Sequence, residues 1–178
     1  RSYNFYPSGH SKPEDGVVNL ALGLGKTVVD GGKCWIYSPR YPKTNPPFSS
    51  IGDMMDQTQS TFWAVNMGKP PEYDPINEEE YLVEGDMKNA ETDGSLHYIA
   101  STYDISNDRL VAGVYTEGPR ILTIAPSLMT REIPLNDVLK SLLDISEKAL
   151  SNEAEIEFAM SLHADYGLPA RFGFLQVR

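Results

Sequence analysis

Three side chains near the C-terminal end of the sequence have the chemistry of a site for a metal ion and phosphate. Glu157 lies in one segment of alternating polar and apolar residues, and Gln176 and Arg178 lie two positions apart in another. Side chains two positions apart on a strand share one face. Mg²⁺ takes oxygen atoms from one or two protein groups and from substrate phosphates, and Arg binds phosphate in a bidentate manner. The alternative, which spacing alone favours, is an exposed hairpin face with ion pairs of low energetic value.

A glycine-containing segment provides the second candidate site. Gly23, Gly25 and Lys26 follow an apolar run and precede Thr27. A P-loop would need glycine at position 20, where Leu20 stands, and a longer helix after the Lys-Thr pair. Two interpretations therefore remain. The glycines either make a tight turn between a strand and a helix, or form a turn whose backbone N–H groups lie near a phosphate.

The other residues with catalytic potential are isolated from one another. The histidines stand at positions 10, 97 and 163, and Cys34 is the single cysteine. This distribution excludes an HExxH zinc site, a cysteine-rich metal site and an internal disulfide framework. We expect His97 and His163 to be structural and Cys34 to be a small core residue.

Charge and hydropathy exclude further classes of function. The 15 Lys and Arg residues against 25 Asp and Glu residues give a net charge of −10. Acidic residues dominate after residue 50, which argues against a nucleic-acid groove. The first fifty residues are basic overall, which is compatible with a phosphate-bearing ligand and equally with ordinary surface variation. No run reaches about 18 apolar residues, so we expect no membrane span.

These candidate residues need secondary-structure elements that position them, and the hydrophobic pattern predicts an α+β fold. We expect a mainly antiparallel sheet packed by helices, in a single domain of 178 residues. The segments between residues 95 and 124 are expected to form a meander, and the last two strands a hairpin. The expected helices are 26–30, 53–65 and 134–150, and the expected strands are 1–6, 17–22, 34–38, 80–84, 95–102, 110–115, 120–124, 154–160 and 171–177.

Two segments resemble a known family. Residues 15–32, which include both glycines, resemble the glycine-containing segment in the nucleotide-binding domain of phosphoenolpyruvate synthase and pyruvate phosphate dikinase. Residues 155–159 and 174–178 are similar to the closing hairpin of that domain, with an acidic-Ile-Glu-aromatic pattern followed by Gln-x-Arg. The two motifs also occur in the order found in the family, and residues 1–7 look like the strand that enters this region.

The resemblance implies an ATP-grasp-like subdomain, in a fold where two α+β subdomains hold ATP between them. In the family, this domain phosphorylates a histidine on a swivelling domain, and a barrel domain passes the phosphoryl group to pyruvate. By similarity, Glu157 and Gln176 would bind Mg²⁺ and the nucleotide phosphates, and Arg178 would contact the phosphates. Gly23 and Gly25 would shape the turn beside ATP. Lys26 stands where the family often has an acidic residue, so it would either meet a phosphate or face solvent.

The parts of the family that this sequence lacks shape the functional expectation. No Gly-Gly-x-Thr-x-His motif occurs, and a barrel needs about 250 residues. We therefore expect part of an ATP-grasp domain from a larger cytoplasmic multidomain protein. Its phosphotransferase activity would depend on an N-terminal ATP-grasp half and on phosphohistidine and pyruvate-binding domains. Alone, the chain would be inactive and bind ATP weakly or undetectably. The main alternative is a non-catalytic nucleotide-binding or interaction module, and a weaker one is a ligase that joins a carboxylate to an amine.

Overall fold

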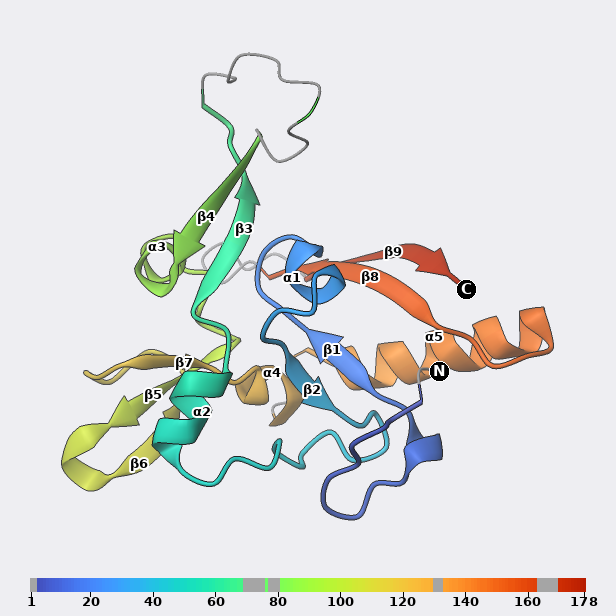
Figure 1. Cartoon of the computed structure of the whole chain (residues 1–178), viewed down its shortest axis with the longest axis horizontal. Coiled ribbons are helices and arrows are strands. Elements are labelled where there is room, and N and C mark those ends of the chain that lie inside the picture. The colour runs from blue at the N-terminus through green and yellow to red at the C-terminus, as the bar shows by residue number, and fades with distance from the viewer. Residues whose placement is uncertain (1–2, 69–75, 77–80, 130–132, 163–169) are drawn as a thin grey trace.

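The computed structural model describes residues 3–68, 76, 81–129, 133–162 and 170–178 and has an α+β architecture (Figure 1). Its described strands form four small antiparallel sheets rather than one large sheet. The expected α+β class with antiparallel pairing is confirmed at this level. Among the described residues, none of the helices combines the length and hydrophobicity that a bilayer span requires.

The centre of the molecule is a two-stranded sheet of β1 (Val18–Leu20) and β2 (Trp35–Tyr37). On both strands the first and third side chains are buried and the middle one is exposed, as the period-two alternation of strands requires. A short helix, α1 (Lys26–Val29), lies between them in the sequence. The predictions for residues 17–22, 26–30 and 34–38 are confirmed. Burial also raises the pKa of Tyr37 above its ordinary value.

The predicted helix over residues 53–65 is wrong in its second half. Helix α2 (Ile51–Gln57) starts at Ser50, whose hydroxyl accepts the Asp53 N–H at 3.0 Å. The following residues form β3 (Thr61–Val65), which pairs with β4 (Leu82–Asp86). Phe62 lies opposite Gly85, and a Cβ atom there would come within 2.7 Å of the Phe62 ring. This cross-strand packing on a distant glycine overrides the helical spacing of the apolar residues.

The predicted meander is also wrong, because the first of the three strands in the sequence, and not the second, lies in the middle of the sheet. Strand β5 (Ala100–Asp104) lies between β6 (Arg109–Ala112) and β7 (Arg120–Leu122). A Cβ atom at Gly118, which has φ +140°, would lie 2.2 Å from the Tyr103 carbonyl oxygen. The connection to β7 therefore passes close against β5 and reaches its other edge. The expected strand over residues 95–102 begins only at Ala100.

Two short helices flank this three-stranded sheet and were not expected from the sequence. They are α3 (Met87–Thr92) and α4 (Ala125–Met129). The Asp86 side chain caps α3 by accepting the N–H groups of Lys88 and Asn89, each at 3.0 Å. A strand was also expected at residues 1–6, but the described residues 3–6 do not form a strand. There the Asn4 side chain accepts the Tyr6 N–H at 3.1 Å, which bends the backbone locally.

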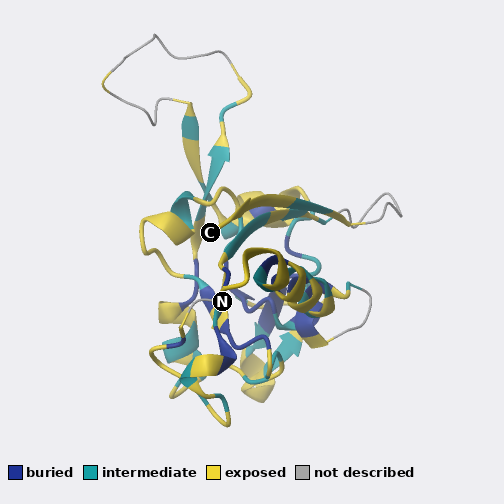
Figure 2. Ribbon diagram, turned by 90° about the vertical axis from the view of Figure 1, so that its right-hand side faces the viewer, coloured by how far each residue is buried: buried dark blue, intermediate teal, exposed yellow. Residues whose placement is uncertain are grey.

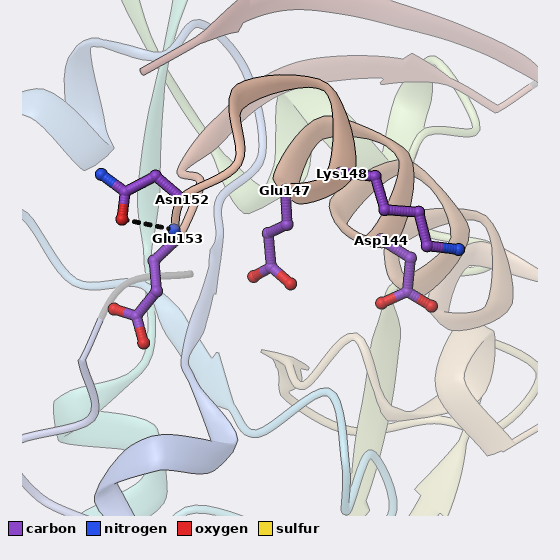
Figure 3. A pocket seen from close by; sticks show the side chains of 5 residues that line it. All are labelled: Asp144, Glu147, Lys148, Asn152 and Glu153. Carbon is purple, nitrogen blue, oxygen red and sulfur yellow. Dashed lines mark hydrogen bonds between the residues drawn. The ribbon is translucent and has the colours of Figure 1, made fainter.

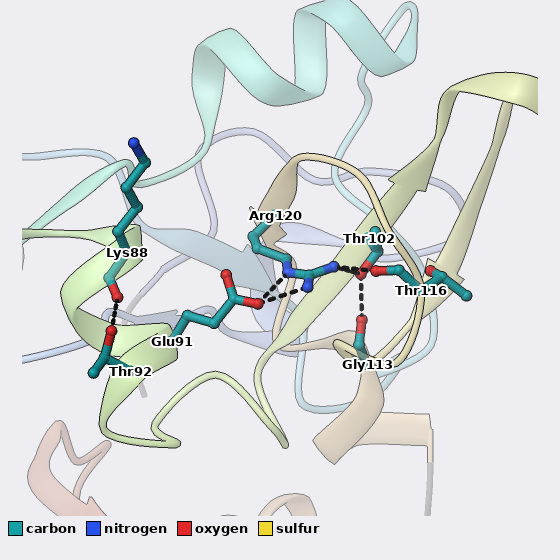
Figure 4. A network of polar contacts seen from close by, with 7 residues as sticks. All are labelled: Lys88, Glu91, Thr92, Thr102, Gly113, Thr116 and Arg120. Carbon is teal, nitrogen blue, oxygen red and sulfur yellow. Dashed lines mark hydrogen bonds and ion pairs between the residues drawn. The ribbon is translucent and has the colours of Figure 1, made fainter.

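A half-buried arginine joins α3 to the sheet (Figure 4). The Arg120 Nε and Nη2 atoms donate to Glu91 Oε1 at 2.9 and 2.6 Å. Its Nη1 donates to Thr102 Oγ1 at 2.7 Å and to the Thr116 carbonyl at 2.6 Å. The Thr102 hydroxyl in turn donates to the Gly113 carbonyl at 2.8 Å. One guanidinium thus connects the helix, the central strand and the loop before β7.

The C-terminal third agrees best with the sequence prediction. Helix α5 (Leu135–Leu150) buries Leu135, Leu139 and Leu143 on one stripe. Strands β8 (Ile156–Ser161) and β9 (Arg171–Val177) then form the predicted antiparallel hairpin. Apolar side chains of both strands pack against the core, which lies in the middle of the molecule (Figure 2). In contrast, the β3–β4 hairpin projects from the molecule and contains no buried residue in its strands.

Candidate functional site

A cavity of about 600 Å³ lies between the glycine-containing turn, helix α5 and the β8–β9 hairpin. It is lined by residues 17–25 on one side and by residues 155–162 on another. Figure 1 shows α1 and β8 next to each other. The two segments that carry the sequence motifs are therefore neighbours in space, although they stand at opposite ends of the chain. This volume falls within the range of about 300–1,000 Å³ that is typical of small-molecule sites.

The wall of this cavity is mainly aliphatic. Its interior is formed by side chains of β1, α5 and β8 together with Ile99 and Ile124. Among the described lining residues there is no Lys, Arg or His side chain. The polar ones are Asn19, Ser95, Ser127, Glu155, Glu157 and Ser161. The cavity can therefore accommodate an apolar or aromatic group, whereas charged groups of a ligand would have to reach Glu157 or the hairpin beyond it.

The two glycines of the turn have different structural roles. Gly23 has φ +86°, and a Cβ atom there would lie 2.5 Å from the Trp63 carbonyl oxygen. The same oxygen accepts the Leu24 N–H at 2.9 Å, so the turn lies directly against β3. Gly25 has φ −59°, and no atom lies within 4 Å of a Cβ built there. The fold thus requires glycine at position 23, whereas at position 25 the lack of a side chain leaves open space beside the cavity.

Lys26 points away from this cavity. Its ammonium lies 2.6 Å from Asp30 Oδ2 and 5.4 Å from the centre of the Trp63 ring. The described lining residues include Gly23 and Gly25 but not Lys26. The Lys26 side chain is 23% exposed, and its ammonium is held by a carboxylate and an aromatic face.

The three side chains predicted on the hairpin lie together. Glu157 is directly opposite Gln176, and the Arg178 guanidinium donates to Glu157 Oε1. Leu175 is the extra residue of a β-bulge next to this pair. Backbone hydrogen bonds of 3.0 and 2.9 Å between Glu155 and Arg178 continue the ladder. Glu157 also lines the cavity, whereas Gln176 and Arg178 are not among its described lining residues. The sequence therefore predicted the grouping correctly.

This ion pair is accessible to solvent and to a ligand. The side chain of Glu157 is 41% exposed and that of Arg178 is 58% exposed. Exposed pairs contribute little to stability, because water solvates both charges nearly as well. Among the described residues, no three His, Cys, Asp or Glu side chains converge on one point. The side chains of Glu157 and Gln176 carry the oxygen atoms that Mg²⁺ accepts as ligands, and a Mg²⁺ ion held by two such groups would take its remaining ligands from phosphates and water.

Sequence reasoning missed Gln59, which holds the glycine-containing turn in place. Its side chain lies in the connection between α2 and β3 and is 5% exposed. The Leu22 N–H donates to Gln59 Oε1 at 2.8 Å, and Gln59 Nε2 donates to the carbonyls of Leu22 and Thr61, each at 2.9 Å. No local pattern could have revealed the contact between Gln59 and Leu22, because the two residues are far apart in the sequence. The helix predicted over residues 53–65 also includes position 59.

A second cavity of about 480 Å³ lies at the C-terminal end of α5 (Figure 3). The side chains of Asp144, Glu147 and Glu153 project to one side of this helix end, and the Asn152 side chain accepts the Glu153 N–H at 2.9 Å. Lys148 is the only basic residue in its described lining. The charged side chains around this second cavity are therefore mainly acidic.

The other sequence candidates do not form a reactive group among the described residues. Burial raises the pKa of the Cys34 thiol, and its Sγ lies 3.4 Å from the Gly32 carbonyl. A protonated thiol is a poor nucleophile. The ring of His97 contacts Tyr98 and Tyr115, and the Tyr115 hydroxyl lies 3.0 Å from Nε2. His163 lies outside the described residues.

No protein-family model, curated protein or solved structure matches the chain.

Proposed function

We propose that this chain binds Mg·ATP in the cavity between the glycine-containing turn and the β8–β9 hairpin, as part of an ATP-grasp-like domain. The observation that carries the proposal is the convergence of the two motif segments. Gly23 and Gly25 on one side and Glu157 on the other line a single cavity. The spacing of residues within each segment does not bring the two segments together, because they belong to different sheets.

The chemistry of the cavity supports a nucleotide in a defined orientation. The aliphatic wall suits the adenine ring, which gains by leaving water. The hairpin end suits the phosphates, because Glu157 and Gln176 are paired directly across the two strands and carry a carboxylate and an amide. Mg²⁺ bound there would neutralise phosphate charge, and the Arg178 guanidinium could exchange its contact with Glu157 for a phosphate oxygen.

Within a complete protein, we propose a phosphotransferase of the phosphoenolpyruvate synthase and pyruvate phosphate dikinase type in the cytoplasm. The chain would hold ATP while a second ATP-grasp subdomain supplies further basic groups. A histidine on another domain would accept the phosphoryl group before its transfer to pyruvate. Such transfers depend mainly on positioning and on charge neutralisation, and in this proposal the bound Mg²⁺, Arg178 and the second subdomain would together supply the neutralisation.

One observation favours a second candidate, a nucleotide-binding module without catalysis. The described lining has no basic side chain, and the ammonium of Lys26 contacts Asp30 and Trp63 instead of the cavity. Phosphoryl transfer needs compensation of the charge that is spread over the phosphate oxygens. A domain without that compensation would bind ATP and leave it intact.

The binding proposal can be tested on the chain itself by NMR. We expect Mg·ATP to shift the backbone amides of Gly23, Gly25 and Glu157 and to leave the β5–β6–β7 sheet unaffected. The titration should extend to about 10 mM, since a Kd in the millimolar range corresponds to about −4 kcal/mol. Mg·AMP serves as a control for the phosphate contribution. Absence of shifts in both motif segments would contradict the proposal.

The catalytic proposal requires the longer polypeptide with its histidine domain. Glu157→Ala or Gln176→Ala should slow Mg·ATP-dependent phosphohistidine formation at least tenfold, which is about 1.4 kcal/mol, because each removes one oxygen ligand of the metal. Glu153→Ala, which removes an exposed carboxylate before β8, is the matched control. Phosphorylation at wild-type rates in both test variants would disprove the site, whereas ATP binding without phosphohistidine would support the non-catalytic module.

A further inference from the structure

Gln59 uses its whole side-chain amide on the backbone around the glycine-containing turn. The Oε1 atom accepts from Leu22, and Nε2 donates to the carbonyls of Leu22 and Thr61. The side chain therefore binds both the N–H and the C=O of one residue, as a neighbouring strand would. An amide side chain offers an acceptor and two N–H donors in one plane without a charge, and Gln59 uses all three.

These contacts act together with a backbone hydrogen bond on the other side of Gly23. The Leu24 N–H donates to the Trp63 carbonyl at 2.9 Å. Leu22 is thus tied to the start of β3 through Gln59, and Leu24 is tied to its middle directly. Gly23 lies between the two attachment points with φ +86°. The turn is held from a segment that contributes no described residue to the cavity lining.

We infer that Gln59 is the positioning residue of the glycine-containing turn. It fixes Leu22, and thereby Gly23 to Gly25, against β3 at the edge of the cavity. Only the expected effect of Gln59 on ATP affinity rests on the proposed function. The fixing of the turn is a property of the fold and can be measured without a ligand. Gln59 itself contacts no ligand in this role.

The test compares Gln59→Leu with a matched buried variant. Ser101→Ala removes another buried hydrogen bond, that of the Ser101 hydroxyl with Thr123 at 2.8 Å, in the three-stranded sheet. The first measurement is amide hydrogen exchange at Leu24, whose N–H bonds to Trp63 and not to Gln59. We expect exchange at Leu24 to become at least about tenfold faster in Gln59→Leu, since loss of the buried contacts releases the turn locally. In Ser101→Ala, protection at Leu24 should fall only as far as global stability falls.

The second measurement is the affinity for Mg·ATP in the same NMR samples. Gln59→Leu should weaken binding about fivefold or more, whereas Ser101→Ala should not, because only the first variant frees the turn. Gln59→Glu provides an internal rescue. Its protonated form has one O–H donor and one carbonyl acceptor, enough for the pair of contacts to Leu22 but not for the contact to Thr61, so the protection factor of Leu24 should recover in part as the pH is lowered through the pKa of the new carboxyl group.

The outcomes separate this inference from the proposed function. Unchanged protection of Leu24 in Gln59→Leu, or no recovery at low pH in Gln59→Glu, overturns the positioning role whether or not ATP binds. Faster exchange at Leu24 in a chain that shows no Mg·ATP shifts supports the positioning role and removes the nucleotide proposal. If Gln59→Leu does not fold, the two protonation states of Gln59→Glu give the same comparison.

Discussion

Two arginine–glutamate pairs in this molecule have the same chemistry and different settings. Arg120 contacts Glu91, Thr102 and the Thr116 carbonyl with three nitrogen atoms, and its side chain is 15% exposed (Figure 4). Arg178 contacts Glu157 through one nitrogen, and its side chain is 58% exposed. The first pair is bonded into the three-stranded sheet, and the second lies on the hairpin beside the cavity.

The difference indicates what each pair can do. The Arg120 guanidinium has exchanged water for protein acceptors on several sides, so removing it would leave the buried Thr102 hydroxyl without its donor and Glu91 without its ion-pair partner. The Arg178 guanidinium keeps much of its contact with water, so another anion can replace Glu157 at low cost. The sheet pair therefore stabilises the fold, whereas the hairpin pair is suited to exchange its partner.

The strongest challenge to this comparison is Arg120→Met, which keeps the aliphatic chain and removes the charge. We expect the free energy of unfolding to fall by about 2–3 kcal/mol. This is less than the usual loss for a fully buried ion pair, because Glu91 remains partly solvated. Urea denaturation followed by circular dichroism measures this change. A loss below about 0.5 kcal/mol, the size expected for an exposed pair, would show that the two pairs are equivalent.

A smaller effect is expected for Thr102→Val, which nearly preserves the side-chain volume. Thr102 is fully buried, and its hydroxyl accepts from Arg120 and donates to the Gly113 carbonyl. Its loss should lower the free energy of unfolding by about 1–2 kcal/mol, since two buried groups lose a partner. In a double-mutant cycle with Arg120→Met the two losses should not add, because the residues share one hydrogen bond. Simple additivity would mean that the network is not coupled.

The smallest effect on stability is expected for Arg178→Met. The free energy of unfolding should change by no more than about 0.5 kcal/mol, and this small change should diminish further at high salt. The same variant should nevertheless weaken binding of Mg·ATP in the NMR titration, because a phosphate contact is lost. A large loss of stability together with unchanged binding would reverse the roles assigned to the two pairs.

Local patterns in the sequence predicted the elements whose structure depends on local interactions. The 3.6-residue spacing of Leu135, Leu139 and Leu143 predicted α5, and the alternation on both sides of Glu157 and Gln176 predicted the hairpin with its grouped side chains. The apolar run over residues 17–22 predicted β1, and the β-prone residues at 34–38 predicted β2. In these segments, backbone preference and burial indicate the same structure.

The failures share a dependence on distant partners. Phe62 fits a helical stripe and yet lies on a strand, because its ring packs over Gly85 of β4. The course of the chain to β7 depends on Gly118 passing the carbonyl of Tyr103. Gln59 is one polar residue in an ordinary segment until Leu22 is placed beside it. The sequence could therefore indicate both motif segments of the site but not the residue that connects one of them to β3.

The cavity walls come from opposite ends of the sequence, which has a consequence for the order of folding. The pairs β1–β2, β3–β4, β5–β6 and β8–β9 each join strands that follow one another in the chain, so their contacts can form early. The cavity can form only when the first and last of these units meet. Closing that long loop costs entropy that rises only logarithmically with its length, by about 0.6 kcal/mol for each doubling. Exposed connections in the middle of the chain that do not line the cavity can therefore change in length with little thermodynamic effect on the site, while the rate at which the site assembles depends on the encounter of its two ends.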